Sequence, residues 1–301
     1  MTALLDAPGT APSPTRPAQR SWAALWVLPP LTLVLFVVLY PLLRVFWESS
    51  AAGSWVGVLG SQIFRDALWR TVAIAAASTL GCLVLGTFLA IVLAFVPFPG
   101  SGMVGRLIDT ILALPSFLIT LAFTFLYGSA GAVNAAISAI TGSTGSDQAP
   151  LLDFLYTPAG VITAEITFFT PFVVRPLLAA FSLIPRAQLD VAASLGASPL
   201  TVLRAVIMPE AWPALAAGGS LVLLLTLNEF GIVLFTGAKG VLTLPVLIYT
   251  RGIVTFDLPG AAVIATVQVT LSLLLYALYR LVFARLTARK EVPDVVVEPA
   301  Q

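Results

Sequence analysis

Six long apolar stretches with almost no charged residues divide this chain. A helix needs about 20 apolar residues to cross a hydrocarbon core about 30 Å thick. Hydrophobic residues make up 59% of the 301 residues and charged residues only 10%, which is more apolar surface than a water-soluble domain can bury. The pattern predicts an all-α integral membrane protein with six transmembrane helices, at Trp22–Phe46, Leu68–Phe95, Leu107–Tyr127, Ala159–Leu183, Ala211–Phe235 and Ala261–Phe283.

Composition also divides the chain into regions. Residues 1–20 are rich in proline, alanine and threonine and predict a disordered cytoplasmic tail. Residues 21–63 would form the first transmembrane helix and an external loop, and residues 64–285 the main membrane domain with a polar loop at 184–210. Residues 286–301 would form a second cytoplasmic tail. Between helices three and four, a short interfacial helix is expected at Ala130–Ile140, followed by an irregular loop.

The distribution of Lys and Arg predicts the orientation. Basic residues near helix ends stay preferentially in the cytoplasm. With both termini inside, the cytoplasmic segments carry more Lys and Arg than the external ones, and the long loop after helix three carries none. The expected location is the bacterial inner (plasma) membrane, with multiple passes and both termini in the cytoplasm.

Several functional classes do not fit the composition. A net charge of +1 is too small for a nucleic-acid-binding face. Because the chain has no histidine and a single cysteine, we expect no metal site, no internal disulfide and no histidine-based catalytic relay. No G-x-x-x-x-G-K-[ST] loop is present, so the chain itself would bind no ATP or other cofactor.

The loop at 184–210 has the pattern of two short helices joined by a tight turn. Gln188–Leu195 favours a helix, and Gly196 stands where a helix can end in the left-handed conformation. Ser198 suits an N-cap and Pro199 the first helical position. Leu200, Leu203 and Ile207 would then share one apolar face of the second helix, which Pro209 would separate from helix five. The pattern predicts a compact docking element at the membrane surface.

This loop resembles the EAA loop of bacterial binding-protein-dependent ABC transporter permeases, written E-A-A, three residues, G, nine residues, I-x-L-P. Asp190 keeps the acidic character of the first position with a shorter side chain, and Val191 replaces the first alanine. The positions that match this pattern and would form the ATPase-coupling loop are Asp190, Val191, Ala192, Gly196, Val206, Met208 and Pro209.

The resemblance extends over roughly Phe64–Phe283 and implies a MetI-like permease fold. It further implies that the chain is not an enzyme and that a separate ABC ATPase subunit uses the ATP. The implied partners are two ATPase subunits, a second permease subunit that is either the same chain or a companion, a solute-binding protein and the lipid bilayer.

Charged side chains inside transmembrane helices are costly and commonly face a cavity or a partner. Glu165 and Arg175 lie ten residues apart in helix four, or about 15 Å along the axis, too far for direct pairing. We expect a structural role for Arg175 near the cytoplasmic end. For Glu165 two interpretations stay open, a lining residue of the substrate path and an interhelical hydrogen bond.

The segment "LTLNEFGIVLF" places Asn228 and Glu229 beside Gly231, which allows a bend in helix five. It is similar to the E-F-G motif of permeases for oxyanions and phosphonates, which implies that Asn228 and Glu229 belong to the substrate path or a gate. For Glu229 a second interpretation stays open, a contact that holds two subunits in register. Together with "TLPVLIY" it resembles permeases for 2-aminoethylphosphonate. Iron, polyamine and sulfate permeases are alternatives. The external segment at 237–260 resembles the surface that receives a binding protein, and an ordinary solvated loop is the other interpretation.

Two further classes are compatible with the hydrophobicity alone. A secondary transporter commonly shows inverted repeats with broken helices at the midplane, and no convincing pair of halves is visible in this sequence. A membrane scaffold without transport activity would leave the motif from Asp190 to Pro209 without a role. The sequence therefore favours the permease subunit of an ATP-driven importer.

Overall fold

The computed structural model describes residues 23–51, 53–142 and 154–288, and within them the regular structure is helical. The helices, in chain order, are α1 (Ala23–Ser49), α2 (Ser54–Leu59), α3 (Gln62–Phe95), α4 (Ser101–Leu112), α5 (Ser116–Tyr127), α6 (Ala132–Thr141), α7 (Pro158–Phe169), α8 (Pro171–Ser182), α9 (Arg186–Ser194), α10 (Pro199–Val202), α11 (Met208–Leu227), α12 (Gly231–Thr236), α13 (Leu244–Tyr249) and α14 (Leu258–Ala288). Two π-helical turns occupy Leu203–Ile207 and Thr250–Val254. The expected all-α class is confirmed.

Within these ranges, six segments are long and apolar enough to cross a membrane, and each overlaps a stretch predicted from the sequence. They cover Trp26–Ser49, Gln62–Phe95, Ser116–Thr141, Pro158–Ser182, Pro199–Leu227 and Leu258–Arg285. The predicted tail at 1–20, the first residue of the predicted helix at Trp22 and most of the C-terminal tail lie outside the described residues.

Helix three is not the single helix that the sequence predicts over Leu107–Tyr127. The structure divides this stretch into α4 and α5, separated at Ala113–Pro115. Pro115 has no backbone N–H and disfavours a helical conformation at the residue before it, so the helix ends ahead of it. The apolar length then continues from α5 into α6, which forms at the position expected for the short helix after helix three.

Helix five is also interrupted, so the single helix predicted over Ala211–Phe235 is wrong. The chain leaves the helical path at Asn228–Phe230, between α11 and α12. Short polar side chains offer the backbone hydrogen bonds that compete with the helix, and Asn228 donates one to the carbonyl of Leu224. Glu229 accepts a hydrogen bond from the N–H of Ile232, in the first turn of α12. The bend that Gly231 was expected to allow is therefore a full break.

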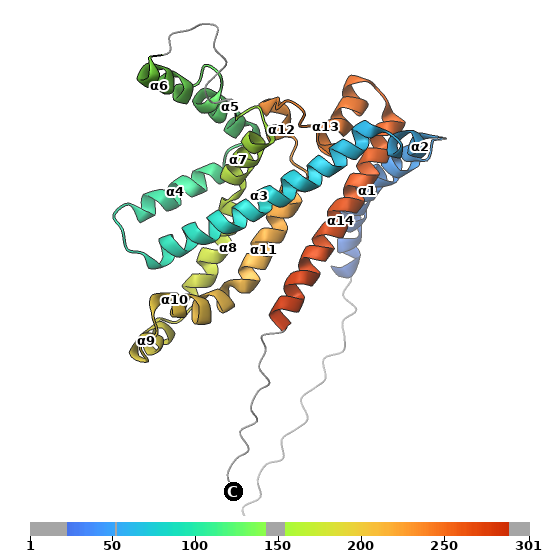
Figure 1. Ribbon diagram of the computed structural model, residues 1–301. Helices are drawn as coiled ribbons and strands as arrows, with labels where there is room; N and C mark the ends of the chain where they lie inside the picture. Colours follow the sequence, from blue (N-terminus) through green and yellow to red (C-terminus); the bar gives the residue numbers. More distant parts are fainter. Residues whose placement is uncertain (1–22, 52, 143–153, 289–301) are drawn as a thin grey trace, which may run out of the picture.

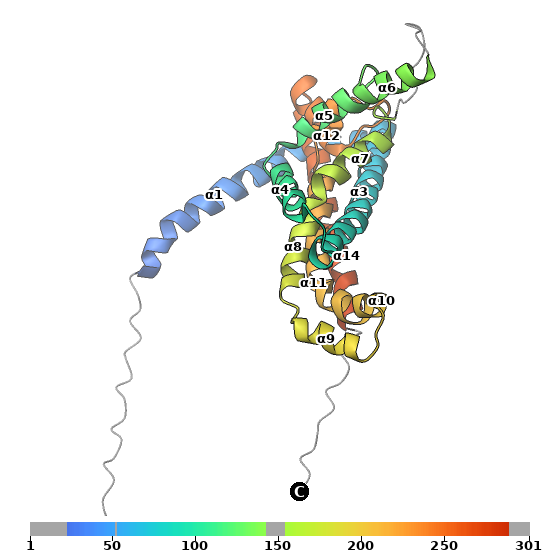
Figure 2. The same ribbon diagram turned by 90° about the vertical axis from the view of Figure 1, so that its left-hand side faces the viewer.

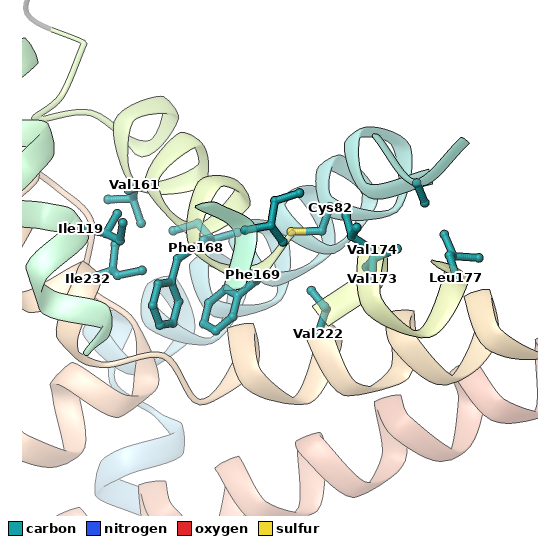
Figure 3. Close-up of a cluster of buried hydrophobic side chains, with 14 of the residues drawn as sticks. Cys82, Ile119, Val161, Phe168, Phe169, Val173, Val174, Leu177, Val222 and Ile232 are labelled. Atoms are coloured by element: carbon teal, nitrogen blue, oxygen red, sulfur yellow. The ribbon is translucent and has the colours of Figure 1, made fainter. Parts of the chain in front are cut away.

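The core of the bundle lies where α3, α7, α8 and α11 pack together (Figures 1 and 3). Cys82 of α3 is fully buried and lies near Val173 and Val174 of α8 in Figure 3. Small residues of α3 allow this close approach. A Cβ atom added at Gly86 would lie 2.8 Å from Cβ of Val173, so glycine is required for the packing distance between α3 and α8.

We expect Gly86→Leu to destabilise the bundle strongly, because the added side chain has to displace Val173 in a tightly packed core. Overpacking of this kind typically costs about 1 to 3 kcal/mol. A lower thermal unfolding temperature in detergent would record the effect. Gly102→Leu is the matched control, since Gly102 is also helical but has open space where a Cβ atom would lie. Equal unfolding temperatures for the two variants would contradict the packing argument.

The segment after α12 is more ordered than the solvated loop considered from the sequence. It forms α13 and a π-helical turn, and Leu244 and Leu247 of α13 are buried against neighbouring helices. The Leu244 N–H donates to Oγ1 of Thr71 in α3 at 2.8 Å. The charged residues Arg251 and Asp257 pair with one another at 3.2 Å. This segment is therefore part of the packed structure.

The first helix stands apart from the bundle over much of its length. It packs against α14, and Figure 2 shows it slanting away from the other helices. Its large apolar side chains, including Trp26, Phe36 and Trp47, are mostly exposed. A helix of this composition is stable in lipid, where its backbone hydrogen bonds are satisfied internally.

Candidate functional site: a surface loop and an interrupted helix

At one end of the molecule, α9 and α10 form a helix-turn-helix that projects beyond the bundle (Figures 1 and 2). Gly196 ends α9 with a φ of 79°, in the left-handed region that favours glycine. The N–H of Gly196 donates to the carbonyl of Ala193, and the N–H of Ala197 donates to the carbonyl of Ala192. This pair of bonds defines a Schellman motif. The left-handed helix end predicted at Gly196 is confirmed.

The start of the second helix is also as predicted. Ser198 is the N-cap of α10, its hydroxyl accepting a hydrogen bond from the N–H of Thr201, and Pro199 takes the first helical position. The predicted apolar face is only partly covered, since Ile207 is buried while Leu200 is 53% exposed. Leu200 is thus available to contact another molecule.

Pro209 does not separate this loop from the membrane helix, contrary to the expectation from the sequence. The chain passes from α10 through the π-helical turn directly into α11, and the N–H of Met208 donates to the carbonyl of Leu203. A proline inside a helix clashes with the carbonyl four residues earlier and lacks its own N–H. The wider π turn accommodates Pro209 without ending the helix. The loop is therefore joined to α11 by continuous helix.

Four of the seven residues matched to the coupling motif line one groove of about 540 Å³ between α9 and the start of α11, namely Val191, Ala192, Val206 and Pro209. Asp190 lies outside the groove lining and is exposed, with no ion pair among the described residues. Gly196 shapes the turn, and Met208 is half-buried against the core. Val191 and Leu195 are 59% and 82% exposed. The loop thus presents an apolar groove beside a carboxylate.

A second polar site lies at the interruption of helix five. Glu229 is only 9% exposed, and its Oε1 atom accepts two hydrogen bonds. The Ile232 N–H donates at 2.8 Å and the Ser116 hydroxyl at 3.1 Å. Ser116 is the first residue of α5, so Glu229 connects the start of α5 with the start of α12. The two interruptions, in helices three and five, therefore meet at one carboxylate.

Asn228 is directed to a different helix. Its Nδ2 atom donates to the carbonyl of Leu224 at 2.8 Å, and Gln268 of α14 donates to Asn228 Oδ1 at 3.3 Å. Gln268 also donates to the carbonyl of Leu227 at 2.7 Å. Leu227 ends α11, so its carbonyl has no partner within the helix. Sequence reasoning missed Gln268, although a lone amide in an apolar transmembrane stretch was a visible signal.

Glu165 is fully buried in α7, and its carboxyl group lies near the buried hydroxyl of Ser78 in α3. Helix α7 packs against α12, whose first turn is hydrogen-bonded to Glu229. The structure thus brings Glu165 and Glu229 into one region, while Asn228 faces α14.

Arg175 does not pair with Glu165, in line with their spacing. It forms an ion pair with Asp109 of α4, and its Nη2 atom donates to the carbonyl of Gly105 at 3.1 Å. These contacts connect α8 to α4, in keeping with the structural role expected for Arg175. Asp109 was not considered from the sequence. In the linear pattern it lay at the edge of an apolar stretch, 66 residues before its partner.

Comparisons with known proteins agree with this arrangement. Residues 82–288 match the family described as binding-protein-dependent transport system inner membrane component. The chain is 47% identical to the putative 2-aminoethylphosphonate transport system permease protein PhnU of Salmonella paratyphi A (strain ATCC 9150 / SARB42), over 92% of this chain and 96% of the relative. It is 32% identical to the thiamine transport system permease protein ThiP of Brucella abortus (strain 2308), over 73% of this chain and 39% of the relative.

Solved structures share the fold. A bacterial ABC transporter that imports the acidic polysaccharide alginate aligns with a TM-score of 0.75 at 20% identity, covering 89% of this chain and 97% of that chain. An inward-facing MetNI methionine ABC transporter aligns with a TM-score of 0.52 at 20% identity, covering 76% of this chain and 98% of that chain. By family match, full-length relatives and fold, this chain belongs to the binding-protein-dependent transport system inner membrane components, the MetI-like permeases of ABC importers.

Proposed function

We propose that this chain forms the translocation path of an ATP-driven importer for 2-aminoethylphosphonate or a related phosphonate. The relatives named for 2-aminoethylphosphonate transport match nearly their whole length at 47% identity, which supports this solute over iron, polyamine or sulfate. ATP is used by separate ATPase subunits, and this chain holds no cofactor. A second permease subunit and a solute-binding protein complete the transporter.

The observation that carries this proposal is the helix-turn-helix of α9 and α10. Its apolar groove and the exposed carboxylate of Asp190 form a surface suited to a soluble ATPase subunit. Because α10 runs into α11 without a break in the helical path, a displacement of the loop would move α11 as well. The motion would then reach the interruption at Asn228–Phe230, where α11 ends.

At that interruption, the proposed role of Glu229 is to hold two half-helices together through hydrogen bonds, and we call this role a latch. It holds the starts of α5 and α12 together through the hydroxyl of Ser116 and the N–H of Ile232. Interrupted helices inside a membrane bundle are tolerated where they line a cavity or are buried in protein. We place the gate of the translocation path at this pair of half-helices, with Glu165 buried beside it.

The proposed orientation puts both termini in the cytoplasm. In Figure 1, α1 begins and α14 ends toward the end of the molecule where α9 and α10 project. An ATPase that binds α9 and α10 lies in the cytoplasm, where ATP is available. The opposite end, with α6, α12 and α13, would face the binding protein outside the inner membrane.

Co-purification tests the proposed partners. A tagged copy of this chain, gently solubilised from cells that express the whole operon, is expected to bring down an ABC ATPase in stoichiometric amount. Substituting Asp190→Lys should reduce the recovered ATPase, because it reverses the charge at the exposed position of the loop. Glu48→Lys, on α1, is the control and should not. Absence of any ATPase from the wild-type preparation would contradict the importer assignment of this chain.

Uptake measurements test the solute. Cells that depend on this transporter should accumulate labelled 2-aminoethylphosphonate, and excess unlabelled ethylphosphonate should compete more strongly than sulfate or putrescine. Deletion of the gene should remove this uptake. If sulfate, iron or a polyamine is accumulated in its place, the proposed solute is wrong while the transport role stands.

A further inference from the structure

A cavity of about 530 Å³ lies between the first half of α3 and the start of α7, away from the coupling loop and from the interruption of helix five. Cavities of this size are typical of small-molecule sites. On α3 its lining follows one face of the helix, with Asp66, Trp69 and Arg70 followed by the small residues Ala73 and Ala77. In Figure 1 this part of α3 and the start of α7 lie opposite the α9 and α10 end. We call it the Arg70 cavity.

Two opposite charges line the Arg70 cavity without neutralising each other. Asp66 and Arg70 are four residues apart on α3, a spacing at which such side chains commonly pair. No ion pair joins them, since the ion pairs of the described residues involve other side chains. Asp66 Oδ1 instead accepts a hydrogen bond from Gln62 Nε2 at 2.8 Å. The separate positions of the two charges leave both available to a ligand.

Arg70 is the stronger anchor for a ligand. The residue is half-buried, and its guanidinium has no hydrogen-bond or ion-pair partner in the described part of the chain. It extends toward the loop after α12, with Nη2 3.8 Å from the Cβ position of Gly240. A guanidinium binds phosphonate and phosphate oxygens through two parallel hydrogen bonds. An unpaired arginine beside a cavity therefore favours a phosphoryl group as the ligand.

The rest of the Arg70 cavity suits a short apolar linker and a cation. Four residues of helix correspond to a rise of about 6 Å, so Asp66 stands one turn from Arg70. Trp69 also lines the cavity and is 72% exposed, and an indole face attracts ammonium groups. Ala73, Ala77 and Ile162 provide apolar walls. The geometry matches a molecule with a phosphoryl group at one end and an ammonium group at the other.

We propose that the Arg70 cavity binds a zwitterionic aminoethyl phosphoryl group, with its anion on Arg70 and its ammonium on Asp66 and Trp69. Two molecules carry this chemistry. One is free 2-aminoethylphosphonate, and this source rests on the proposed function. The other is the headgroup of phosphatidylethanolamine in the surrounding bilayer, which does not depend on the transported solute.

The test uses the full-length chain in phosphatidylglycerol nanodiscs. In the first arm, 2-aminoethylphosphonate and ethylphosphonate are titrated and followed by phosphorus NMR of the ligand. In the second arm, native mass spectrometry measures retention of added phosphatidylethanolamine. Arg70→Gln should weaken the binding of the aminoethyl phosphoryl ligand about tenfold, as expected for loss of a charge-assisted hydrogen bond. Asp66→Asn should remove the preference for the aminated ligand and leave ethylphosphonate binding unchanged.

Arg65→Gln is the matched control. Arg65 lies on the same helix, is exposed, and donates to Gln62 Oε1 and the carbonyl of Gly60 outside the cavity lining. It should bind as wild type. An Arg70-dependent change in the first arm identifies the free solute as the ligand, and a change in the second arm identifies the lipid headgroup. Binding in both arms that is unaffected by Arg70→Gln overturns the proposal.

The outcomes also separate this proposal from the proposed function. If cells take up no 2-aminoethylphosphonate but phosphatidylethanolamine retention depends on Arg70, the cavity assignment stands and the solute assignment fails. If uptake is normal and Arg70→Gln changes neither binding arm, the transporter assignment stands and the cavity assignment fails.

Discussion

Gly196→Pro is expected to abolish solute uptake while the protein still inserts in the membrane. Gly196 has a φ of 79°, whereas proline is held near −65°, so the turn between α9 and α10 cannot keep its shape. The substitution also removes the N–H that donates to the carbonyl of Ala193. The loop is exposed, and no atom lies within 4 Å of the Cβ position, so the bundle itself should fold. Uptake of labelled solute and the amount of protein in the membrane are measured together.

Gly142→Pro is the control for this variant. Gly142 also ends a helix, α6, with a φ of 69° and open space around it, but it lies away from the proposed ATPase surface. Proline cannot adopt this φ either, and the variant should keep more than half of the uptake. A Gly196→Pro variant that transports normally would refute coupling through α9 and α10. A variant absent from the membrane would be followed by Gly196→Ala, which strains the same φ more mildly and should lower uptake partially.

Glu229→Ala is expected to reduce uptake by more than tenfold. The substitution leaves the N–H of Ile232 and the hydroxyl of Ser116 without their acceptor, in a site where Glu229 is 9% exposed. Each buried donor that loses its partner costs about 1 to 3 kcal/mol. The starts of α5 and α12 would no longer be held together. Faster hydrogen exchange at the first turn of α12 should accompany the loss of uptake.

Glu229→Gln distinguishes a latch from a binding group. A glutamine side chain keeps an oxygen that can accept both hydrogen bonds, so a latch should retain most of the uptake. Ser116→Ala removes one of the two donors and should have an intermediate effect. If Glu229→Gln is as inactive as Glu229→Ala, the negative charge itself is required. The latch would then be wrong, and direct contact with the solute or a cation would replace it.

Much of the fold could be predicted from local patterns, because each depends on residues close in sequence. Apolar length identified the membrane-crossing segments, since lipid requires each one to satisfy its own backbone. The helix end at Gly196 and the cap at Ser198 followed from residues within one turn. The spacing from Asp190 to Pro209 indicated the permease family, and the full-length relatives confirmed it.

The interruptions were harder to predict, because competing local signals have similar strengths. Pro115 and the pair Asn228 and Glu229 weaken a helix without requiring it to break. The same ambiguity affected Pro209, which ended the helix in the prediction but lies within continuous helix after a π turn in the structure. Whether a proline breaks, bends or is accommodated depends on the neighbouring helices that pack against it.

By itself, the sequence determined the membrane class, the six apolar segments, the family and the local shape of the coupling loop. Only the tertiary structure showed that Glu229 contacts Ser116, that Arg175 pairs with Asp109, and that Asp66 and Arg70 share a cavity without pairing. The physical reason is that a polar group in a membrane bundle takes its partner from whichever helix packs beside it. That neighbour is set by the summed packing of many apolar side chains, which no short stretch of sequence contains.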